Sequence, residues 1–227
     1  MQFKTKDIQL SFNHIMIDLT VIENLDELFD ALVNKGSDHP DVIDERIPYW
    51  ADLWASAIGL SQYLVDNRTL VQDKKVLEIG CGLGLPAIVA GKLGAAQTTA
   101  TDYLPEALDF AQLNWARNLS LDTARFEQLD WRNIPEIYKN TPPQYKPDIL
   151  LAADVAYEKR AFAPLLEAFD HLVKPEGTIL IAEPNRYISK DFFNNWAQNG
   201  FSVKRKTCNV ERRGHVFTVN IFELKRI

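Results

Sequence analysis

From residue 55 onward, short apolar segments alternate with amphipathic ones, and this alternation limits the possible folds more than any other feature of the sequence. The predicted strands are residues 75–79, 97–101, 124–129, 148–152, 178–182, 201–207 and 216–224, and the predicted helices are residues 57–64, 85–93, 105–118, 160–173 and 191–198. Strands that alternate with helices form an open parallel sheet with helices on both faces. Residues 208–215 separate the last two strands. This short spacing allows a hairpin and therefore an antiparallel edge strand.

The first fifty residues lie outside this regular pattern. Weak alternation of apolar and polar residues over positions 3–19 predicts one or two strands. Asn24 is placed to cap a short helix, and residues 36–40 break that helix. The apolar face of this helix carries Leu25, Leu28, Phe29 and Leu32. We therefore expect residues 1–50 to form a cap or extension on a single domain of residues 51–227.

The composition is that of a globular protein, with 46% hydrophobic and 25% charged residues in a chain of 227. The net charge of -6 disfavours binding to nucleic acid, because an acidic surface repels phosphates. The two cysteines do not make a disulfide framework, and no segment has the pattern of a signal peptide or the length of a membrane span. These features predict a cytoplasmic location. The four histidines show no metal-ligand spacing, so no metal is expected.

A glycine-rich loop lies where the first predicted strand turns into the following helix, at residues 78–86 (EIGCGLGLP). Gly80, Gly82 and Gly84 allow the backbone to approach a ligand closely and to adopt positive φ. The helix N-terminus adds free backbone N–H groups. Dinucleotide-binding folds use a related loop, so the glycines alone do not identify the ligand.

Three details of this loop favour a methyl donor over NAD. The glycine spacing is G-x-G-x-G rather than G-x-G-x-x-G. Glu78 precedes the glycines, where its carboxylate can hold a positively charged amino-acid group through a water or backbone link but would repel a pyrophosphate. Pro86 pre-sets the first helical turn, and Cys81 is expected to be a small buried filler. The predicted cofactor is S-adenosyl-L-methionine, with S-adenosyl-L-homocysteine as its product.

Acidic residues also follow the next two predicted strands. Asp102 closes the second strand, where a carboxylate can accept hydrogen bonds from both ribose hydroxyls, as it also does in NAD enzymes. Its neighbour Tyr103 is included in the predicted donor site. Asp130 follows the third strand and can receive the adenine amino group, while the indole of Trp131 can lie against the adenine ring. Ordinary core packing is an equally good interpretation of Trp131.

Three blocks of the sequence together resemble the family 16 protein-lysine methyltransferases, a seven-β-strand group. They are residues 48–57 (PYWADLWASA), the loop of residues 78–86, and residues 153–158 (ADVAYE), which look like the family's D-x-x-Y motif after the fourth strand. The resemblance covers roughly residues 45–225. Ala55 stands where the family usually has proline, and Ala87 where it often has glycine. These departures weaken assignment to any one subgroup.

The resemblance implies a Rossmann-like seven-strand methyltransferase sheet, mostly parallel with an antiparallel edge strand. It implies an N-methyltransferase that modifies lysine side chains of a protein substrate. It also implies that Trp54 and Trp131 border the donor, and Ala153 is included in the predicted donor site. The acceptor amine would face Asp154 and Tyr157, which are the predicted catalytic residues.

These residue types suit methyl transfer to an amine. A free lysine has a pKa of about 10.4, so most of it is protonated and must lose a proton before it reacts. Partly dry aromatic walls from Tyr49, Trp50 and Tyr157 would disfavour the ammonium and attract the methylated cation. Asp154 could orient the amine or pass its proton outward. Tyr49 and Trp50 are therefore predicted to bind the substrate.

Other interpretations of the same residues remain open. The aromatic residues of block 48–57 could be an apolar staple between the N-terminal cap and the sheet, and Asp154 and Tyr157 could be a helix cap and a core aromatic residue. Ligands bind at the carboxyl ends of parallel strands, which favours the functional interpretation. Residues 183–186 could line the acceptor cleft, whereas residues 212–213 are expected in a solvated turn, although they could grip an acidic substrate.

Four rival functions fit parts of the pattern. The acceptor could be a small amine or a heterocyclic nitrogen, and the chain could be a donor-binding module without catalysis. An NAD-dependent oxidoreductase is disfavoured by the loop spacing and Glu78. A nucleic-acid methyltransferase is disfavoured because residues 154–157 read DVAY rather than Asn/Asp-Pro-Pro-aromatic.

Overall fold

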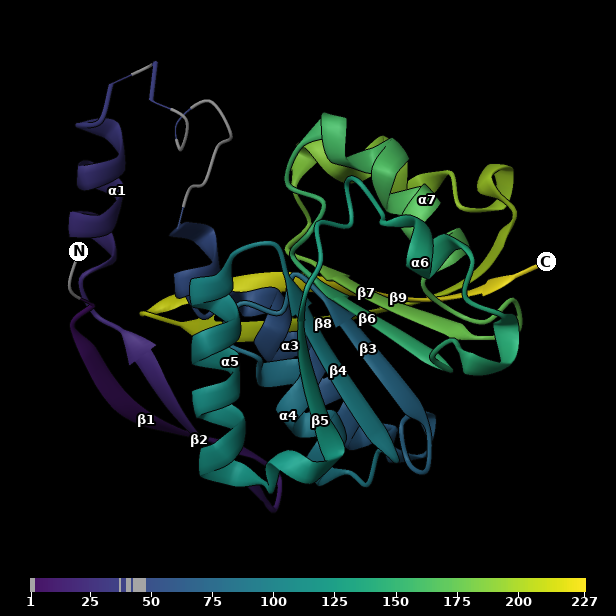
Figure 1. Cartoon of the computed structure of the whole chain (residues 1–227), viewed down its shortest axis with the longest axis horizontal. Coiled ribbons are helices and arrows are strands. Elements are labelled where there is room, and N and C mark those ends of the chain that lie inside the picture. The colour runs from purple at the N-terminus through teal and green to yellow at the C-terminus, as the bar shows by residue number, and fades with distance from the viewer. Residues whose placement is uncertain (1–2, 37, 40–41, 43–47) are drawn as a thin grey trace.

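The computed structural model of the chain describes residues 3–36, 38–39, 42 and 48–227. Its main element is a seven-stranded sheet with the order β5-β4-β3-β6-β7-β9-β8 (Figure 1). The strands are β3 (Lys75–Ile79), β4 (Gln97–Asp102), β5 (Ala124–Gln128), β6 (Ile149–Ala153), β7 (Thr178–Glu183), β8 (Phe201–Arg212) and β9 (His215–Arg226). The first five pair in parallel, and β9 pairs antiparallel with both β7 and β8. The predicted mostly parallel sheet with an antiparallel pair at its edge is confirmed.

Helices cover both faces of this sheet. One face carries α3 (Ala55–Asp66), α4 (Leu85–Lys92) and α5 (Pro105–Asn118), and the other carries α6 (Glu136–Lys139), α7 (Phe162–His171) and α8 (Lys190–Asn194). Successive strand residues point to opposite faces. Leu150 accordingly packs with the α7 side and Leu151 with the α4 side, and both side chains are fully buried. The predicted covering of the sheet by helices on both faces is confirmed by these two cores.

The N-terminal segment forms a separate two-stranded sheet that packs on the α5 side. It consists of β1 (Thr5–Phe12) and β2 (Ile15–Ile22), followed by α1 (Leu25–Val33). The backbone N–H of Thr20 in β2 donates to Asn114 Oδ1 at 2.7 Å, and the Asn114 amide donates to the Thr20 carbonyl at 3.2 Å. The buried side chains of β2 belong to the same core as α3 and α4. The boundary at residue 50 between a cap and a domain stays a prediction.

The predicted cap of α1 is wrong in its detail. Asn24 precedes the helix, but its side chain makes no capping hydrogen bond. Instead, Asn24 Oδ1 accepts the backbone N–H of Lys4 at 2.9 Å and so links the helix to the beginning of β1. The helix ends at Val33, before Gly36, and positions 37 and 40 of the predicted break lie outside the described residues.

The largest differences from the predicted element boundaries lie in the C-terminal part of the chain. The C-terminal hairpin is longer on both strands, and only Arg213 and Gly214, both with positive φ, connect them. Most of β8 is exposed and polar at the sheet edge, so it lacks the apolar pattern of a buried strand. A 3-10 turn over Lys159–Ala161 precedes α7, and α8 stops at Asn194, with a second 3-10 turn over Ala197–Asn199. None of the described helices is long and apolar enough to span a membrane.

Candidate functional site

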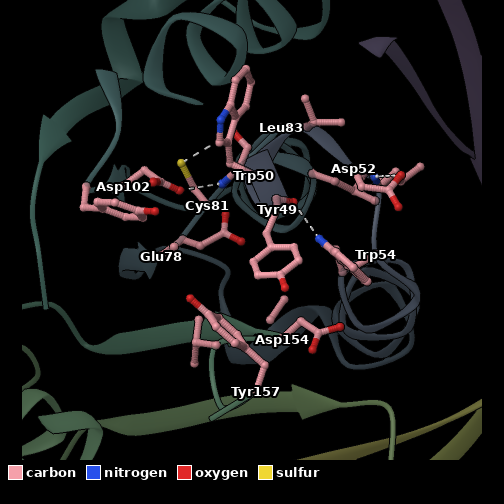
Figure 2. A pocket seen from close by; sticks show the side chains of 18 of the residues that line it. Tyr49, Trp50, Asp52, Trp54, Glu78, Cys81, Leu83, Asp102, Asp154 and Tyr157 are labelled. Atoms are coloured by element: carbon pink, nitrogen blue, oxygen red, sulfur yellow. Dashed lines mark hydrogen bonds between the residues drawn. The ribbon is translucent and has the colours of Figure 1, made fainter. Parts of the chain in front are cut away.

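A cavity opens at the carboxyl ends of β3, β4 and β6, beside the glycine loop (Figure 2). Twelve of the fourteen predicted site residues line it: Tyr49, Trp50, Trp54, Glu78, Gly80, Gly82, Asp102, Tyr103, Trp131, Ala153, Asp154 and Tyr157. Gly84 and Asp130 do not. Eight lining residues were not predicted: Asp52, Leu53, Ala57, Cys81, Leu83, Leu85, Arg132 and Val155. The structure thus brings together residues that lie up to 108 positions apart (157 minus 49).

The glycine loop needs its glycines for two different reasons. Gly80 and Gly82 have φ of 61° and 50°, a conformation that residues with a Cβ rarely adopt. A Cβ at Gly82 would lie 2.9 Å from the carbonyl oxygen of Trp50, so the loop also packs against the aromatic segment. Gly84 has φ of 80°, and a Cβ there would lie 3.1 Å from the Cβ of Ala111 in α5. Gly84 therefore lets α4 approach α5 and does not line the cavity.

Glu78 lines the cavity, but its side chain is buried beneath the glycine loop and paired with the backbone. Its Oε2 accepts the backbone N–H of Ala87 at 2.9 Å, and Thr101 Oγ1 donates to its carbonyl at 2.7 Å. Burial raises the pKa of Glu78 well above its usual range, and the nearby Asp102 carboxylate adds to the increase. The carboxylate therefore joins the strand to an otherwise unsatisfied N–H in the first turn of α4. Its predicted link to the donor's amino group stays a prediction.

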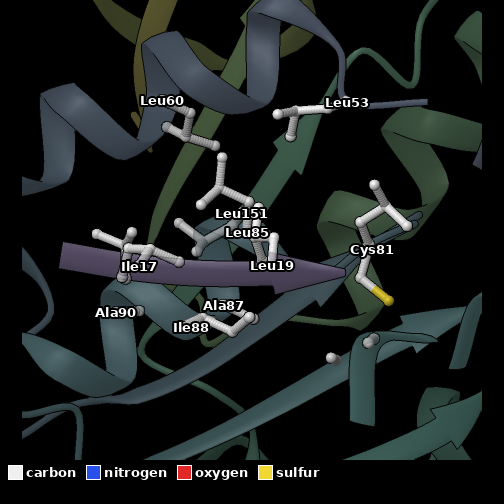
Figure 3. Packing of buried hydrophobic residues seen from close by; sticks show 14 of the residues in the cluster. Ile17, Leu19, Leu53, Leu60, Cys81, Leu85, Ala87, Ile88, Ala90 and Leu151 are labelled. Carbon is white, nitrogen blue, oxygen red and sulfur yellow. The ribbon is translucent and has the colours of Figure 1, made fainter. Parts of the chain in front are cut away.

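The first turn of α4 rests on a closely packed core. Figure 3 shows Ile17 and Leu19 of β2 lying over Ala87 and Ile88 of α4. Both β2 side chains are fully buried. Because close packing resists small displacements, this contact fixes the position of the helix N-terminus behind the glycine loop. The N-terminal sheet thus supports the loop without contributing a residue to the cavity lining.

Asp102 is the second buried carboxylate of the cavity. Its Oδ2 accepts the backbone N–H of Gly82 at 3.1 Å, and its Oδ1 accepts that of Leu104 at 3.2 Å. Burial raises the pKa of Asp102 to about 6, although these hydrogen bonds oppose the increase. A carboxylate has about four lone-pair sites, so both oxygens can still accept hydroxyl hydrogen bonds. The end of β4 therefore fits the predicted ribose contact.

Asp130 and Trp131 occupy different positions. Asp130 binds Arg132 through two parallel contacts, Nε to Oδ1 at 2.8 Å and Nη2 to Oδ2 at 2.9 Å, and lies outside the cavity lining. Arg132, which sequence reasoning missed, lines the cavity and lies 4.7 Å from the centre of the Tyr103 ring. Trp131 lines the cavity and also belongs to the core on the α7 side. Both interpretations of Trp131 are therefore compatible with its position.

Aromatic side chains form one wall of the cavity. Tyr49 and Trp50 come from a 3-10 turn, η1 (Pro48–Ala51). The Tyr49 ring lies 5.4 Å from that of Tyr157 and 6.0 Å from that of Trp54, whose Nε1 donates to the Tyr49 carbonyl at 2.7 Å. Burial raises the pKa of Tyr157 to about 12, so its hydroxyl stays protonated at neutral pH. This wall is aromatic and half-buried, and its predicted role in binding the acceptor amine stays a prediction.

Trp50 has two roles. Its ring contacts those of Phe3 and Phe110 at 5.6 Å and 5.5 Å, which is the staple between the N-terminal segment and the sheet. It also lines the cavity. The structure thus shows the staple, and its position at the cavity is compatible with substrate binding, which stays a prediction.

Asp154 lies where β6 ends, with a left-handed φ of 61°. Ser56 Oγ of α3 donates to its Oδ2 at 3.1 Å, and the guanidinium of Arg186 binds its Oδ1. The Asp154 side chain is therefore buried and paired, rather than a helix cap. The sequence placed residues 183–186 near the acceptor cleft but gave no sign that Arg186 would bind Asp154.

The tip of the β8–β9 hairpin also reaches this region. Arg212 binds Asp52 Oδ1, and Arg213 contacts the same oxygen at 3.0 Å. Both Arg212 and Asp52 have side chains only 14% exposed, so the predicted solvated turn is wrong for Arg212 and right for Arg213, which is 62% exposed. No group of three or more His, Cys, Asp or Glu side chains within the described residues could hold a metal ion.

The donor half of the cavity fits a nucleoside with a charged amino-acid end. It combines a buried carboxylate at the end of β4, the backbone of Gly80 and Gly82, and the aromatic side chains of Tyr103 and Trp131. Seen together, these groups can hold a sugar, a base and a cationic chain. The individual donor contacts stay predictions.

Comparison with known proteins agrees with this arrangement. Residues 49–199 match the model of a family described as lysine methyltransferase. The protein N-lysine methyltransferase METTL21A of Danio rerio is 30% identical over 176 residues, which cover 76% of this chain and 78% of that protein. The histone-arginine methyltransferase METTL23 of Rattus norvegicus is 36% identical over 176 residues, 74% of each chain.

Solved structures show the same fold. A putative RNA methyltransferase from Pyrococcus horikoshii has a TM-score of 0.61 at 19% identity, covering 91% of this chain and 98% of that one. Magnesium protoporphyrin IX methyltransferase from Synechocystis, crystallised with bound S-adenosylmethionine, has a TM-score of 0.59 at 16% identity, covering 89% and 92%. The chain is therefore an S-adenosylmethionine-dependent methyltransferase, and by its match over residues 49–199 it belongs to the lysine methyltransferase family.

Proposed function

We propose that this enzyme transfers a methyl group from S-adenosylmethionine to the side-chain nitrogen of lysine residues in a protein. The observation that carries this proposal is the shared cavity. Asp154 and Tyr157 of the D-x-x-Y motif line the same space as Gly80, Gly82 and Asp102. A reacting nitrogen can therefore lie next to the donor without any movement of the sheet, and positioning of this kind supplies much of the rate increase in such reactions.

When bound, the donor supplies a methyl group on a positively charged sulfur. The protein has to present a neutral amine, because only the free lone pair can form the new carbon–nitrogen bond. The rings of Tyr49 and Tyr157 disfavour the ammonium form of the acceptor by excluding water. Asp154 accepts a hydrogen bond from the amine and provides a place for its proton. The transfer would need no metal or oxidant, because the donor's sulfur would keep the electron pair of the carbon–sulfur bond as the new carbon–nitrogen bond forms.

The similarity to METTL23 raises the question whether the acceptor is arginine instead. A guanidinium binds best to a carboxylate that can accept two parallel hydrogen bonds. In this cavity Asp154 is already bound by Arg186, and Asp52 is bound by Arg212 and Arg213. Glu78 and Asp102 are engaged by backbone N–H groups in the donor half. These pairings favour a lysine acceptor, which needs only one acceptor oxygen.

The cysteines and the net charge bear on where the enzyme acts and on which substrates it binds. The thiols of Cys81 and Cys208 are free, as in the reducing cytoplasm, and we propose that location. The acidic net charge supports a protein substrate rather than nucleic acid. A basic segment around the modified lysine would be attracted to such a surface.

The test uses the purified chain with tritiated S-adenosylmethionine and a cell extract from which small molecules have been removed. We expect labelled proteins whose tandem mass spectra place the methyl groups on lysine, and no labelling with Asp154→Asn, which keeps the shape of the side chain. Methyl groups on arginine would overturn the proposal that lysine is the acceptor. If label appeared only after the small-molecule fraction was added back, the substrate would be a metabolite and the proposal of a protein substrate would be wrong.

A further inference from the structure

The carboxylate of Asp154 is almost fully removed from solvent, since its side chain is 5% exposed. A buried carboxylate destabilises a fold unless a cation and hydrogen bonds compensate for its lost hydration. Ser56 supplies a hydrogen bond to Oδ2, and Arg186 supplies the positive charge at Oδ1. The geometry of Asp154 thus depends on a residue 32 positions away, outside the D-x-x-Y motif.

Arg186 is itself held firmly by the loop that follows β7. Its backbone N–H donates to Glu183 Oε2 at 3.0 Å. Ser189 Oγ donates to the same carboxylate oxygen at 3.2 Å and to the Arg186 carbonyl at 3.0 Å. Glu183 is 4% exposed, so this anchor is in the protein interior. The loop is therefore fixed at the position from which Arg186 reaches Asp154.

The hydrogen bonds that hold Glu183 extend into the C-terminal hairpin. Asn220 of β9 pairs with Glu183 across the sheet, and its Nδ2 donates to Glu183 Oε1 at 2.6 Å. The Oδ1 atom of Asn220 accepts hydrogen bonds from Arg205 at 2.7 Å and Thr207 at 3.0 Å, both in β8. A satisfied buried network of this kind rigidifies the groups that it connects. Three adjacent strands therefore determine where the guanidinium of Arg186 lies.

We propose that Arg186 is a positioning residue of the acceptor site, which holds the Asp154 carboxylate as its counter-ion while that carboxylate receives the acceptor amine. Arg186 does not line the cavity, so it acts through Asp154 and not on the acceptor. Each carboxylate oxygen has two lone pairs, so Ser56 and Arg186 leave capacity for the amine. This inference rests on the proposed function, because it assumes that Asp154 meets the acceptor.

The first experiment measures turnover of a peptide that carries the methylated lysine. We expect Arg186→Ala to lower kcat by roughly 100-fold or more, as loss of a positioned acid–base group does, while the affinity for S-adenosylhomocysteine stays at its wild-type value. Arg186→Lys should recover part of the activity, and free guanidinium ion at non-denaturing concentration should partly restore Arg186→Ala. The control Arg68→Ala, at an exposed arginine remote from the cavity, should behave as wild type.

The second experiment needs no acceptor. Thermal unfolding is compared for Arg186→Ala, Asp154→Ala and the double variant. Arg186→Ala leaves a buried carboxylate unpaired, so we expect the double variant to lose less Tm than the sum of the single losses. Strictly additive losses, or wild-type kcat in Arg186→Ala, would overturn the inference. Should the wild-type chain methylate no lysine, the proposed function fails, whereas this thermal comparison still decides whether Arg186 pairs with Asp154.

Discussion

Asp52 and Arg213 are 161 residues apart in the chain, yet Oδ1 of Asp52 accepts a hydrogen bond from the Arg213 guanidinium at 3.0 Å. Arg212 binds the same oxygen from the same hairpin. Asp52 follows the 3-10 turn that carries Tyr49 and Trp50, so these contacts tie the tip of the β8–β9 hairpin to the aromatic wall of the cavity. The length of the hairpin beyond the sheet has a physical role: it reaches this segment.

These contacts with Asp52 predict that substitution of the two arginines affects acceptor binding differently. Arg212→Ala removes a partly buried charge partner and should weaken acceptor binding, raising KM by about tenfold, because Tyr49 and Trp50 lose their fixed position. Arg213→Ala removes an exposed contact that contributes about 0–1 kcal/mol, so its KM should stay near that of wild type. Steady-state kinetics of both variants measure this. Equal effects of the two substitutions on KM would contradict the role of the buried Arg212–Asp52 contact in fixing the aromatic wall.

Asp102 predicts how donor binding depends on pH. Burial raises the pKa of Asp102 to about 6, so the carboxylate is charged at pH 7.5 and becomes protonated as the pH falls through about 6. A protonated carboxyl accepts ribose hydrogen bonds less well, so donor affinity should fall below about pH 6. Calorimetric titration with S-adenosylhomocysteine between about pH 5 and 8 measures this dependence. Asp102→Asn serves as the control, because it should bind the donor weakly and with no inflection in this range.

The same residue affects stability in the opposite sense. A carboxyl whose folded pKa lies above its unfolded value binds a proton more tightly in the native state, so folding stability is lost as pH rises from about 4 to about 6. Without donor, Asp102→Asn should therefore have a higher Tm than wild type at pH 7.5 and gain less at pH 4.5. Differential scanning calorimetry at the two pH values tests this. A Tm gain that does not depend on pH would point to packing instead of charge.

Residues near the glycine loop show how far the sequence predicts the site. The alternating strands and helices placed Glu78, Asp102 and Asp154 at strand ends, and parallel strands bring those ends together, so the cavity followed from local pattern and topology. The predicted bounds of the helix over residues 105–118 agree with the structure, because Pro105 marks its first position. Local pattern was enough wherever one element alone determines the position of a side chain.

Contacts between distant segments could not be predicted in the same way. Nothing near Arg186 in sequence indicates that it binds Asp154, since the pairing arises from the parallel neighbours β6 and β7 and the turn after β7. Even the nearby pairing of Asp130 with Arg132 was missed, although the predicted adenine contact of Asp130 stays a prediction. The polar edge strand β8 was predicted too short because exposed strands lack an apolar signature. Several side chains can compete for the same charged or polar partner in the folded protein. Their spacing in the sequence does not show which of them binds it.

Asp154 predicts a separation of binding from chemistry. Asp154→Ala should abolish methyl transfer while leaving affinity for S-adenosylhomocysteine nearly intact, because Asp154 is predicted to face the acceptor amine, whereas the loop glycines and Asp102, which are predicted to hold the donor, lie at the ends of β3 and β4. Filter-bound radioactivity and calorimetry measure the two quantities. Full turnover by Asp154→Ala on a true substrate would remove this residue from the mechanism.

The glycine loop offers the last prediction, which separates donor binding from packing with three matched substitutions. Gly82→Ala, Gly84→Ala and Gly214→Ala each force a Cβ onto a positive φ, and this strain alone costs about 1–2 kcal/mol. A Cβ at Gly214 would meet no atom within 4 Å beyond its two chain neighbours, so Gly214→Ala measures the strain by itself. Gly84→Ala adds a clash with Ala111 and should lower Tm further, whereas Gly82→Ala pushes on the Trp50 carbonyl at the cavity and should weaken S-adenosylhomocysteine binding most. If Gly84→Ala reduced donor affinity more than Gly82→Ala, the placement of Gly84 outside the cavity would be wrong.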